Sequence, residues 1–213
     1  QFTSQLGQPD SLLSIDCRSL MTYNIPFKTD ATFVVVDSMI SRVANNALEG
    51  RRRECLEALK ELQEAEWSIQ SLSDIQPEYL HKVADVLDER LTNRVTHVVD
   101  ENQRVRKGIA FLKANDISDF GSLMVESHNS SRDLYEVSHP NLDFLVDVAG
   151  KQDGVFGARL TGAGFGGAVL ALVNNNNISR VIEVVSKEYE TEKGIVPNIT
   201  TVSIPGGVKV EQV

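Results

Sequence analysis

The chain has 213 residues, 41% of them hydrophobic and 24% charged, which is enough for one globular domain of good size or one and a fraction. Its formal net charge of −9 argues against a nucleic-acid-binding surface. No apolar run approaches the roughly 18 residues of a membrane span, and no signal peptide is recognisable. Cys17 and Cys55 lie in apolar patterns typical of buried free thiols, so we expect a reducing, cytoplasmic location.

The N-terminal third predicts two strands and a long helix. β-branched and apolar residues predict strands over Leu12–Cys17 and Thr32–Asp37, joined through Pro26 and Lys28–Asp30. A helical pattern follows from about Ser38 to Trp67. Its apolar positions are Val43, Ala47, Leu48, Cys55, Leu56, Leu59 and Leu62.

Helical patterns continue through the middle of the chain. Pro77 suits a helix start, and Asn115 suits a helix end. Ser118 is the expected N-cap of a helix that ends near Ser127, and Ser138 the expected N-cap of a helix over Pro140–Ala149. The two apolar stripes before Asn115 are Tyr79, Leu80, Val83, Val86 and Leu87, and then Val95, Val98, Val99, Val105, Ile109 and Leu112.

The last third predicts a hairpin, a helix and closing strands. The hairpin strands are Val155–Leu160 and Ala168–Val173, and the helix is Ile178–Tyr189. Closing strands are expected over Ile199–Ile204 and Val208–Val213. This order indicates an α+β fold in which helices cover one face of an antiparallel sheet. No linker is long enough to separate two independent domains.

Four glycines crowd the loop of the predicted hairpin: Gly162, Gly164, Gly166 and Gly167. Glycine has no Cβ, so such a loop can adopt positive φ and bring backbone N–H groups close to a ligand. Because ordering glycines costs backbone entropy, we interpret the loop as a candidate anion- or phosphate-binding loop. A tight hairpin turn is the alternative.

The loop does not fit the common nucleotide-binding motifs. It matches G-x-G-x-x-G, but a dinucleotide site needs a helix next, and residues 168–173 read as a strand. A protein kinase needs a following Lys and an H-R-D loop, and Asp119–Gly121 precedes the glycines instead of following them. A Walker A loop needs Gly-Lys-Ser/Thr, which is absent. A strand–glycine loop–strand hairpin that faces phosphates remains.

Other polar residues have weaker cases for function. His128 could act as a base, but a lone His is more often a hydrogen-bonded spacer. Arg132 could meet a phosphate, although we favour an ion pair with Asp133. Arg51–Arg53 point in different directions on a helix, so they cannot all reach one ligand. We expect no metal site, because ligand spacing is absent among His81, His97, His128 and His139.

Several of these segments together resemble one enzyme family. Gly121–His128, with Arg132–Ser138 and Pro140–Asp143, looks like the central signature of galactokinases. Leu160–Gly167 resembles the third conserved motif of the GHMP small-molecule kinases. The resemblance covers essentially the whole chain in the family's order, and its further segments are Leu13–Leu20 and Arg51–Cys55.

The resemblance implies transfer of the ATP γ-phosphate to the anomeric hydroxyl of a sugar, with Mg²⁺, at a site between two lobes. It implies a GHMP-kinase C-terminal domain with a ferredoxin-like sheet over residues 38–213, and the tail of the N-terminal lobe over residues 1–37. The expected partners are the sugar, ATP and the N-terminal lobe, with no nucleic acid and no membrane. Backbone donors to the transferring phosphoryl group are expected at Gly162, Gly164, Phe165, Gly166 and Gly167.

The chain departs from the family pattern in two ways. The family's catalytic Asp, in its Met-Asp-Gln segment, is expected just upstream of Gln1, together with the serine-rich ATP loop, so we expect the chain alone to be inactive. The family's sugar-contacting Tyr aligns with Leu48, which cannot donate a hydrogen bond. Galactose is the first expectation, and a related aldose or sugar acid the second. A non-catalytic sensor that binds sugar, ATP and a regulatory protein is the alternative function.

Overall fold

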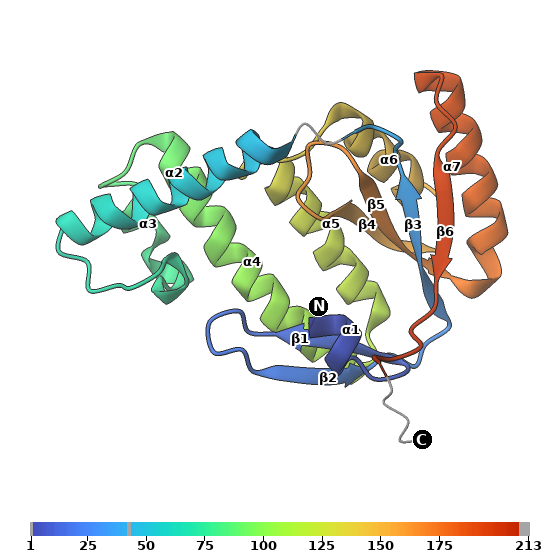
Figure 1. The fold of residues 1–213 in the computed structure, drawn as a ribbon, viewed down its shortest axis with the longest axis horizontal. Coiled ribbons are helices and arrows are strands. Elements are labelled where there is room, and N and C mark those ends of the chain that lie inside the picture. The colour runs from blue at the N-terminus through green and yellow to red at the C-terminus, as the bar shows by residue number, and fades with distance from the viewer. Residues whose placement is uncertain (1, 42–43, 209–213) are drawn as a thin grey trace.

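The computed structural model describes residues 2–41 and 44–208 of the chain (Figure 1). Short 3₁₀ turns lie at Leu72–Asp74, Pro77–Tyr79 and Asn175–Asn177. In chain order the helices and strands are α1 (Phe2–Leu6), β1 (Ser11–Ile15), β2 (Thr22–Pro26), β3 (Ala31–Asp37), α2 (Ala44–Glu64), α3 (Leu80–Val83), α4 (Glu89–Ala114), α5 (Ile117–Asp133), α6 (Pro140–Gly150), β4 (Val155–Thr161), β5 (Ala168–Asn174), α7 (Ile178–Lys193) and β6 (Asn198–Val202).

The centre of the fold is a four-stranded antiparallel sheet in the order β4-β5-β3-β6. β3 is an inner strand, and it pairs with β5 over its whole length and with β6 from Phe33 to Asp37. From β3 onward the chain runs strand, helices, strand, strand, helix, strand. Together with the strand order of the sheet, this is the ferredoxin-like arrangement. The predicted α+β fold with an antiparallel sheet is confirmed.

Helices pack against both faces of this sheet, whereas the sequence predicted one covered face. Val34 and Val36 of β3 belong to the core shared with α6 and α7. Phe33 belongs instead to a core shared with α4, α5 and β2. The reason is that β3 is apolar on both faces, a pattern typical of a strand with both faces buried. A third core joins α2, α3 and the first half of α4 (Figure 1).

A two-stranded hairpin, β1–β2, lies outside the main sheet. The sequence predicted only a connection where β2 forms, because Pro26 ends a short and mixed segment. The expected boundary between residues 37 and 38 separates β3 from its partners β5 and β6. The end of the described chain returns to this hairpin, since the N–H of Asp10 donates to the carbonyl of Ile204 at 3.1 Å.

The helix caps differ from the predicted ones. The carboxylate of Asp116, not Ser118, accepts the N-terminal hydrogen bond of α5. The Nδ1 atom of His139, not Ser138, does so for α6. The hydroxyl of Ser138 instead donates to Asp143 at 2.5 Å.

The limits of some elements also differ from the predictions. Helix α5 runs on to Asp133, past the predicted end near Ser127, so the polar residues 128–133 are helical. Helix α2 begins at Ala44, later than the predicted start near Ser38. Val43 lies outside the described residues, as does all of the predicted strand Val208–Val213 except Val208.

Candidate functional site

The glycine loop, residues 162–167, joins β4 to β5 as the sequence predicts. Its backbone lies largely in the left-handed region, with φ of 79° at Gly162, 77° at Gly164 and 57° at Phe165. The next two glycines, Gly166 and Gly167, have φ of 120° and 82°. A residue with a Cβ is strained in most of these conformations, which is why the segment needs glycine.

Two amides of the loop donate inside the protein. The N–H of Phe165 donates to the carbonyl of Val137 at 2.7 Å, and the N–H of Gly167 donates to the carbonyl of Ile40 at 3.1 Å. Gly164 lies so close to the same connection that a Cβ there would be 2.0 Å from the carbonyl oxygen of Val137. Phe165 and Gly167 thus anchor the loop, and within the described part of the chain no acceptor is found for the amides of Gly162, Gly164 and Gly166.

The far side of the loop is held by a buried serine. Ser38 is fully buried, and both its N–H and its hydroxyl donate to the carbonyl of Gly167, at 2.9 and 2.6 Å. The carbonyl of Ser38 accepts from the hydroxyl of Tyr189 on α7 at 2.9 Å, and that hydroxyl accepts from Asn141 on α6 at 2.8 Å. The loop is therefore tied through Ser38 and Tyr189 to α7 and α6.

The loop has the chemistry of an anion-binding turn. Its residues carry no acidic side chain, and successive residues with positive φ can present N–H groups to one anion. The loop itself therefore places no negative side-chain charge at this surface. Within the described ranges, no group of three or more His, Cys, Asp or Glu side chains is arranged to hold a metal ion.

Leu48, the position that aligns with the family's sugar-contacting Tyr, lies on α2. Leu48 is 41% exposed on the first part of the helix. Gly166 lies close to Ile40 and Ser41, and the chain enters α2 three residues after Ser41. The first residue of α2, Ala44, therefore lies close in sequence to the segment that the glycine loop contacts.

His128 is a spacer and not a free base. It is 1% exposed, its Nδ1 accepts from the N–H of Leu160 at 3.3 Å, and its Nε2 lies 3.2 Å from Asp143 Oδ1. Burial lowers the pKa of His128, so its ring is neutral near pH 7. Arg132 pairs with Asp133 at 2.7 Å, which is the structural role that the sequence favoured.

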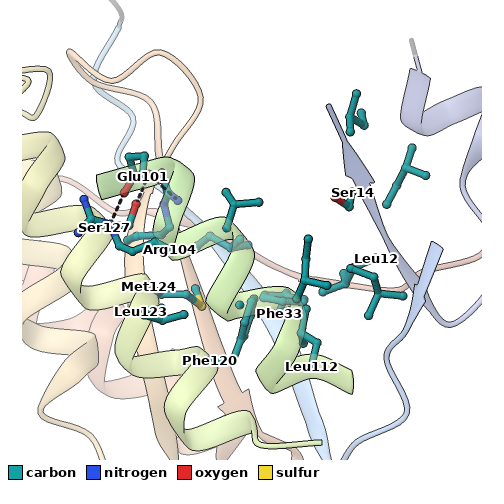
Figure 2. Close-up of a pocket in the computed structure, with 18 of the residues that line it drawn as sticks. Leu12, Ser14, Phe33, Glu101, Arg104, Leu112, Phe120, Leu123, Met124 and Ser127 are labelled. Carbon is teal, nitrogen blue, oxygen red and sulfur yellow. Dashed lines mark hydrogen bonds and ion pairs between the residues drawn. The ribbon is translucent and has the colours of Figure 1, made fainter. Parts of the chain in front are cut away.

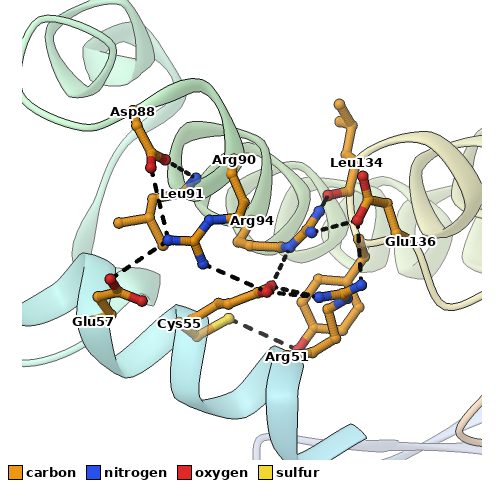
Figure 3. Close-up of polar contacts among 11 residues, drawn as sticks. Arg51, Cys55, Glu57, Asp88, Arg90, Leu91, Arg94, Leu134 and Glu136 are labelled. Carbon is orange, nitrogen blue, oxygen red and sulfur yellow. Dashed lines mark hydrogen bonds and ion pairs between the residues drawn. The ribbon is translucent and has the colours of Figure 1, made fainter. Parts of the chain in front are cut away.

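A buried arginine that the sequence pattern did not single out lies between α2 and the segment of Leu134 and Glu136 (Figure 3). Arg94 on α4 is 1% exposed and donates to Glu54 and to Glu136, each at 2.6 Å. Arg51, the first of the three consecutive arginines, also donates to Glu54, at 2.7 Å, while the next two are exposed. In the sequence, Arg94 is distinguished only by its position as a charged residue next to the apolar stripe of α4.

A large apolar cavity lies away from the glycine loop, between the β1–β2 hairpin and α4, α5 and the sheet (Figure 2). Its volume is about 650 Å³. At one end Glu101 accepts from Arg104 at 2.5 Å and from Ser127 at 2.6 Å. Leu12 and Ser14 of β1 lie across the cavity from this polar end.

Residues 109–191 match the family described as GHMP kinases C terminal. The chain is 39% identical over 209 residues to a galactokinase of Roseiflexus sp. (strain RS-1), and the match covers 98% of this chain and 54% of that protein. The crystal structure of Lactococcus lactis galactokinase complexed with galactose has a TM-score of 0.90 at 34% identity, covering 95% of this chain and 53% of that one. The L. major mevalonate kinase structure, with a TM-score of 0.52 and 18% identity over 92% of this chain and 50% of that one, shares the fold alone.

The chain carries a GHMP-kinase C-terminal domain over residues 109–191. It is similar over nearly its whole length to galactokinases, to whose C-terminal part it corresponds. The chain spans about half the length of the curated relatives that it matches. Of the described helices, none is both long and apolar enough to cross a lipid bilayer.

Proposed function

We propose that the protein that carries this chain is an ATP-dependent sugar 1-kinase of the galactokinase type. The observation that carries the proposal is the similarity to galactokinases over nearly the whole chain, including the L. lactis structure in complex with galactose. The reaction transfers the γ-phosphoryl group of ATP to the anomeric oxygen of galactose or a related sugar. ADP leaves, and the proton of the hydroxyl passes to a base.

In this proposal the glycine loop forms one wall of the phosphate site. The amides of Gly162, Gly164 and Gly166 would donate to the charge on the transferring phosphoryl group. Because Phe165 and Gly167 are bonded to carbonyls of the protein, their part is to fix the loop. A loop that is fixed in advance needs no reorganisation as charge develops, which is how a donor lowers the barrier.

The base, the main ATP-binding segment and the other lobe are proposed to belong to the whole protein, as the family resemblance implies. The span of the chain, about half the length of its curated relatives, supports a second lobe. The apolar cavity beside α4 and α5 also supports a second lobe, because Val105, which lines the cavity, is 56% exposed in this chain. The cytoplasmic location stays a prediction.

The proposal is tested by assaying ATP consumption by the full-length natural protein across a panel of hexoses, pentoses and sugar acids. Turnover that depends on galactose or a related aldose is the expected result. No turnover with any sugar would contradict the catalytic proposal. If sugar and ATP then raised the thermal unfolding temperature without turnover, the non-catalytic sensor would replace it.

A further inference from the structure

The glycine loop rests on a short connection, Leu134–Ser138, between α5 and α6. The loop meets this connection at Val137, whose carbonyl accepts from the N–H of Phe165 at 2.7 Å and touches Gly164. Val137 is 5% exposed, so the contact is packed on all sides. Any displacement of Val137 would therefore move the middle of the glycine loop.

The connection is not regular secondary structure, and a backbone bond from the N–H of Val137 to the carbonyl of Ser131, at 3.0 Å, ties it to the end of α5. Glu136, next to Val137, has φ of 51°, a left-handed conformation that is rare for a residue other than glycine. Such a conformation persists only when the surrounding structure determines it. Here the side chain of Glu136 is bound by two arginines from other helices.

Arg94 makes the decisive contacts (Figure 3). Its guanidinium donates to the carbonyl of Leu134 and to the carboxylate of Glu136, so it grips the connection by main chain and side chain. The third contact of the guanidinium is with Glu54 of α2, at 2.6 Å. Burial opposes ionisation of Glu54, but hydrogen bonds from Arg94 and Arg51 outweigh burial and lower the pKa of Glu54.

The same pair of acids is bridged a second time. Arg51 of α2 donates to Glu54 at 2.7 Å and to Glu136 at 3.2 Å. Charge-assisted and forked hydrogen bonds of this kind fix geometry more closely than single neutral ones do. α2, α4 and the connection are thus joined at one point, and α2 is the helix that carries Leu48.

We propose that Glu136, gripped by Arg94 and Arg51, is a positioning residue that sets the place of the glycine loop through Val137 and ties it to α2. This inference rests on the proposed kinase function. Glu136 touches neither ATP nor sugar in this account. It acts by holding the donors of Gly164 and its neighbours where charge develops in the transition state, so its loss affects kcat more than KM.

The test compares Glu136→Ala with the matched control Glu57→Ala. Glu57 is also a half-exposed carboxylate that pairs with an arginine of α4, Arg90, at 3.5 Å, but it has no contact with the connection. Glu136 is 54% exposed and belongs to none of the three cores. After its replacement the buried Arg94 keeps its bonds to Glu54 and to the carbonyl of Leu134. Steady-state kinetics and amide hydrogen exchange by NMR are measured on the full-length natural protein for both variants.

In Glu136→Ala we expect kcat to fall about tenfold with both KM values within about twofold of wild type. Exchange of the Phe165 amide should accelerate about tenfold, while the Gly167 amide, bonded to Ile40, changes much less. Glu57→Ala should leave all of these unchanged.

The proposal is overturned if Phe165 exchanges as in wild type, if kcat is unaffected although exchange is faster, or if Glu57→Ala has the same effects. A wild-type protein that phosphorylates no sugar would refute the kinase proposal. The exchange rate of the Phe165 amide would still show whether Glu136 holds the bond between Phe165 and Val137.

Discussion

Gly164 and Gly194 both adopt a left-handed backbone, with φ of 77° and 66°, but their surroundings differ. A Cβ at Gly194, after α7, would meet nothing within 4 Å, whereas one at Gly164 would lie 2.0 Å from the carbonyl oxygen of Val137. The first position therefore requires only a permissive backbone. The second also requires space, because the glycine loop lies directly on its support.

We expect Gly194→Ala to lower the free energy of unfolding by about 1–2 kcal/mol, the cost of a left-handed L-residue. Gly164→Ala should cost clearly more, because the connection or the loop must shift as well. Urea unfolding of both variants measures the difference. Equal costs would mean that the close approach at Val137 is not part of the folded protein in solution.

Leu48 is the residue at which sugar selectivity is most open to test. It is 41% exposed on α2, so its side chain reaches the surface of the described chain. We expect Leu48→Tyr to lower the KM for galactose by up to about tenfold, since a new hydrogen bond contributes about 0.5–1.5 kcal/mol. Leu56→Tyr, at a 58% exposed position of the same helix, is the control and should change nothing. An unchanged KM in Leu48→Tyr would place the sugar elsewhere.

At the scale of elements, α4 and α5 are joined by a buried histidine. His97 Nδ1 lies 2.8 Å from the hydroxyl of Ser130, and the ring stacks on Tyr135 with centroids 4.4 Å apart. Burial, helped by the positive charges of Arg104 and Arg159, lowers the pKa of His97 to about 4. The folded protein thus holds the neutral ring, and charging it must weaken the contact between the helices.

Because the folded-state pKa is lower than the unfolded value near 6.5, the stabilisation from neutral His97 is complete above about pH 6.5 and is lost as pH falls toward about 4. The loss amounts to about 3 kcal/mol, from 1.4 kcal/mol per pKa unit. We expect His97→Gln to flatten the fall in unfolding free energy between about pH 7 and about pH 4.5. Urea titrations at both pH values check this. Parallel profiles for the two proteins would show that His97 does not titrate in this way.

The elements themselves could largely be predicted from the sequence, and their mutual contacts could not. The glycine hairpin is visible because two apolar strands flank the glycines, and α4 ends where Asn115 permits a left-handed cap. β2 was missed because a short strand ending in Pro26 resembles a connection. Its partner β1 supplies the pairing that identifies it.

The residues that hold the glycine loop could not be predicted either, because their contacts join segments that are far apart in the sequence. Arg94 is 40 residues from Glu54 and 42 from Glu136, so no local pattern connects them. A charged residue beside an apolar stripe reads as a solvated edge of the helix, yet here it is buried by α2 and the connection. The amide of Phe165 looked like a ligand donor because its acceptor, Val137, lies in another segment.

At the scale of the whole molecule, the apolar cavity lies between the β1–β2 hairpin, α4, α5 and the ferredoxin-like sheet. We propose that the other lobe covers its open side. Val105 of α4 lines the cavity and is 56% exposed in this chain, whereas Val125 of α5 is 37% exposed and lies outside it. In the full-length protein the first valine would be buried and the second would stay at the surface.

In the full-length protein we expect Val105→Asp to lower stability by about 1–3 kcal/mol, because a charge at a covered surface loses its hydration. Val125→Asp should change stability by less than about 0.5 kcal/mol. Thermal or urea unfolding of the two variants distinguishes them. If Val105→Asp cost no more than its control, the cavity would be open to water and the proposed contact would fail.

The central claim, phosphoryl transfer to an anomeric oxygen at a site bordered by the glycine loop, is tested most directly by ³¹P NMR of the reaction product. The full-length protein is incubated with ATP, Mg²⁺ and galactose or the best sugar of the panel. We predict ADP and one sugar phosphate whose phosphorus couples to the anomeric proton. A phosphate on any other carbon, or no sugar phosphate at all, would contradict the account.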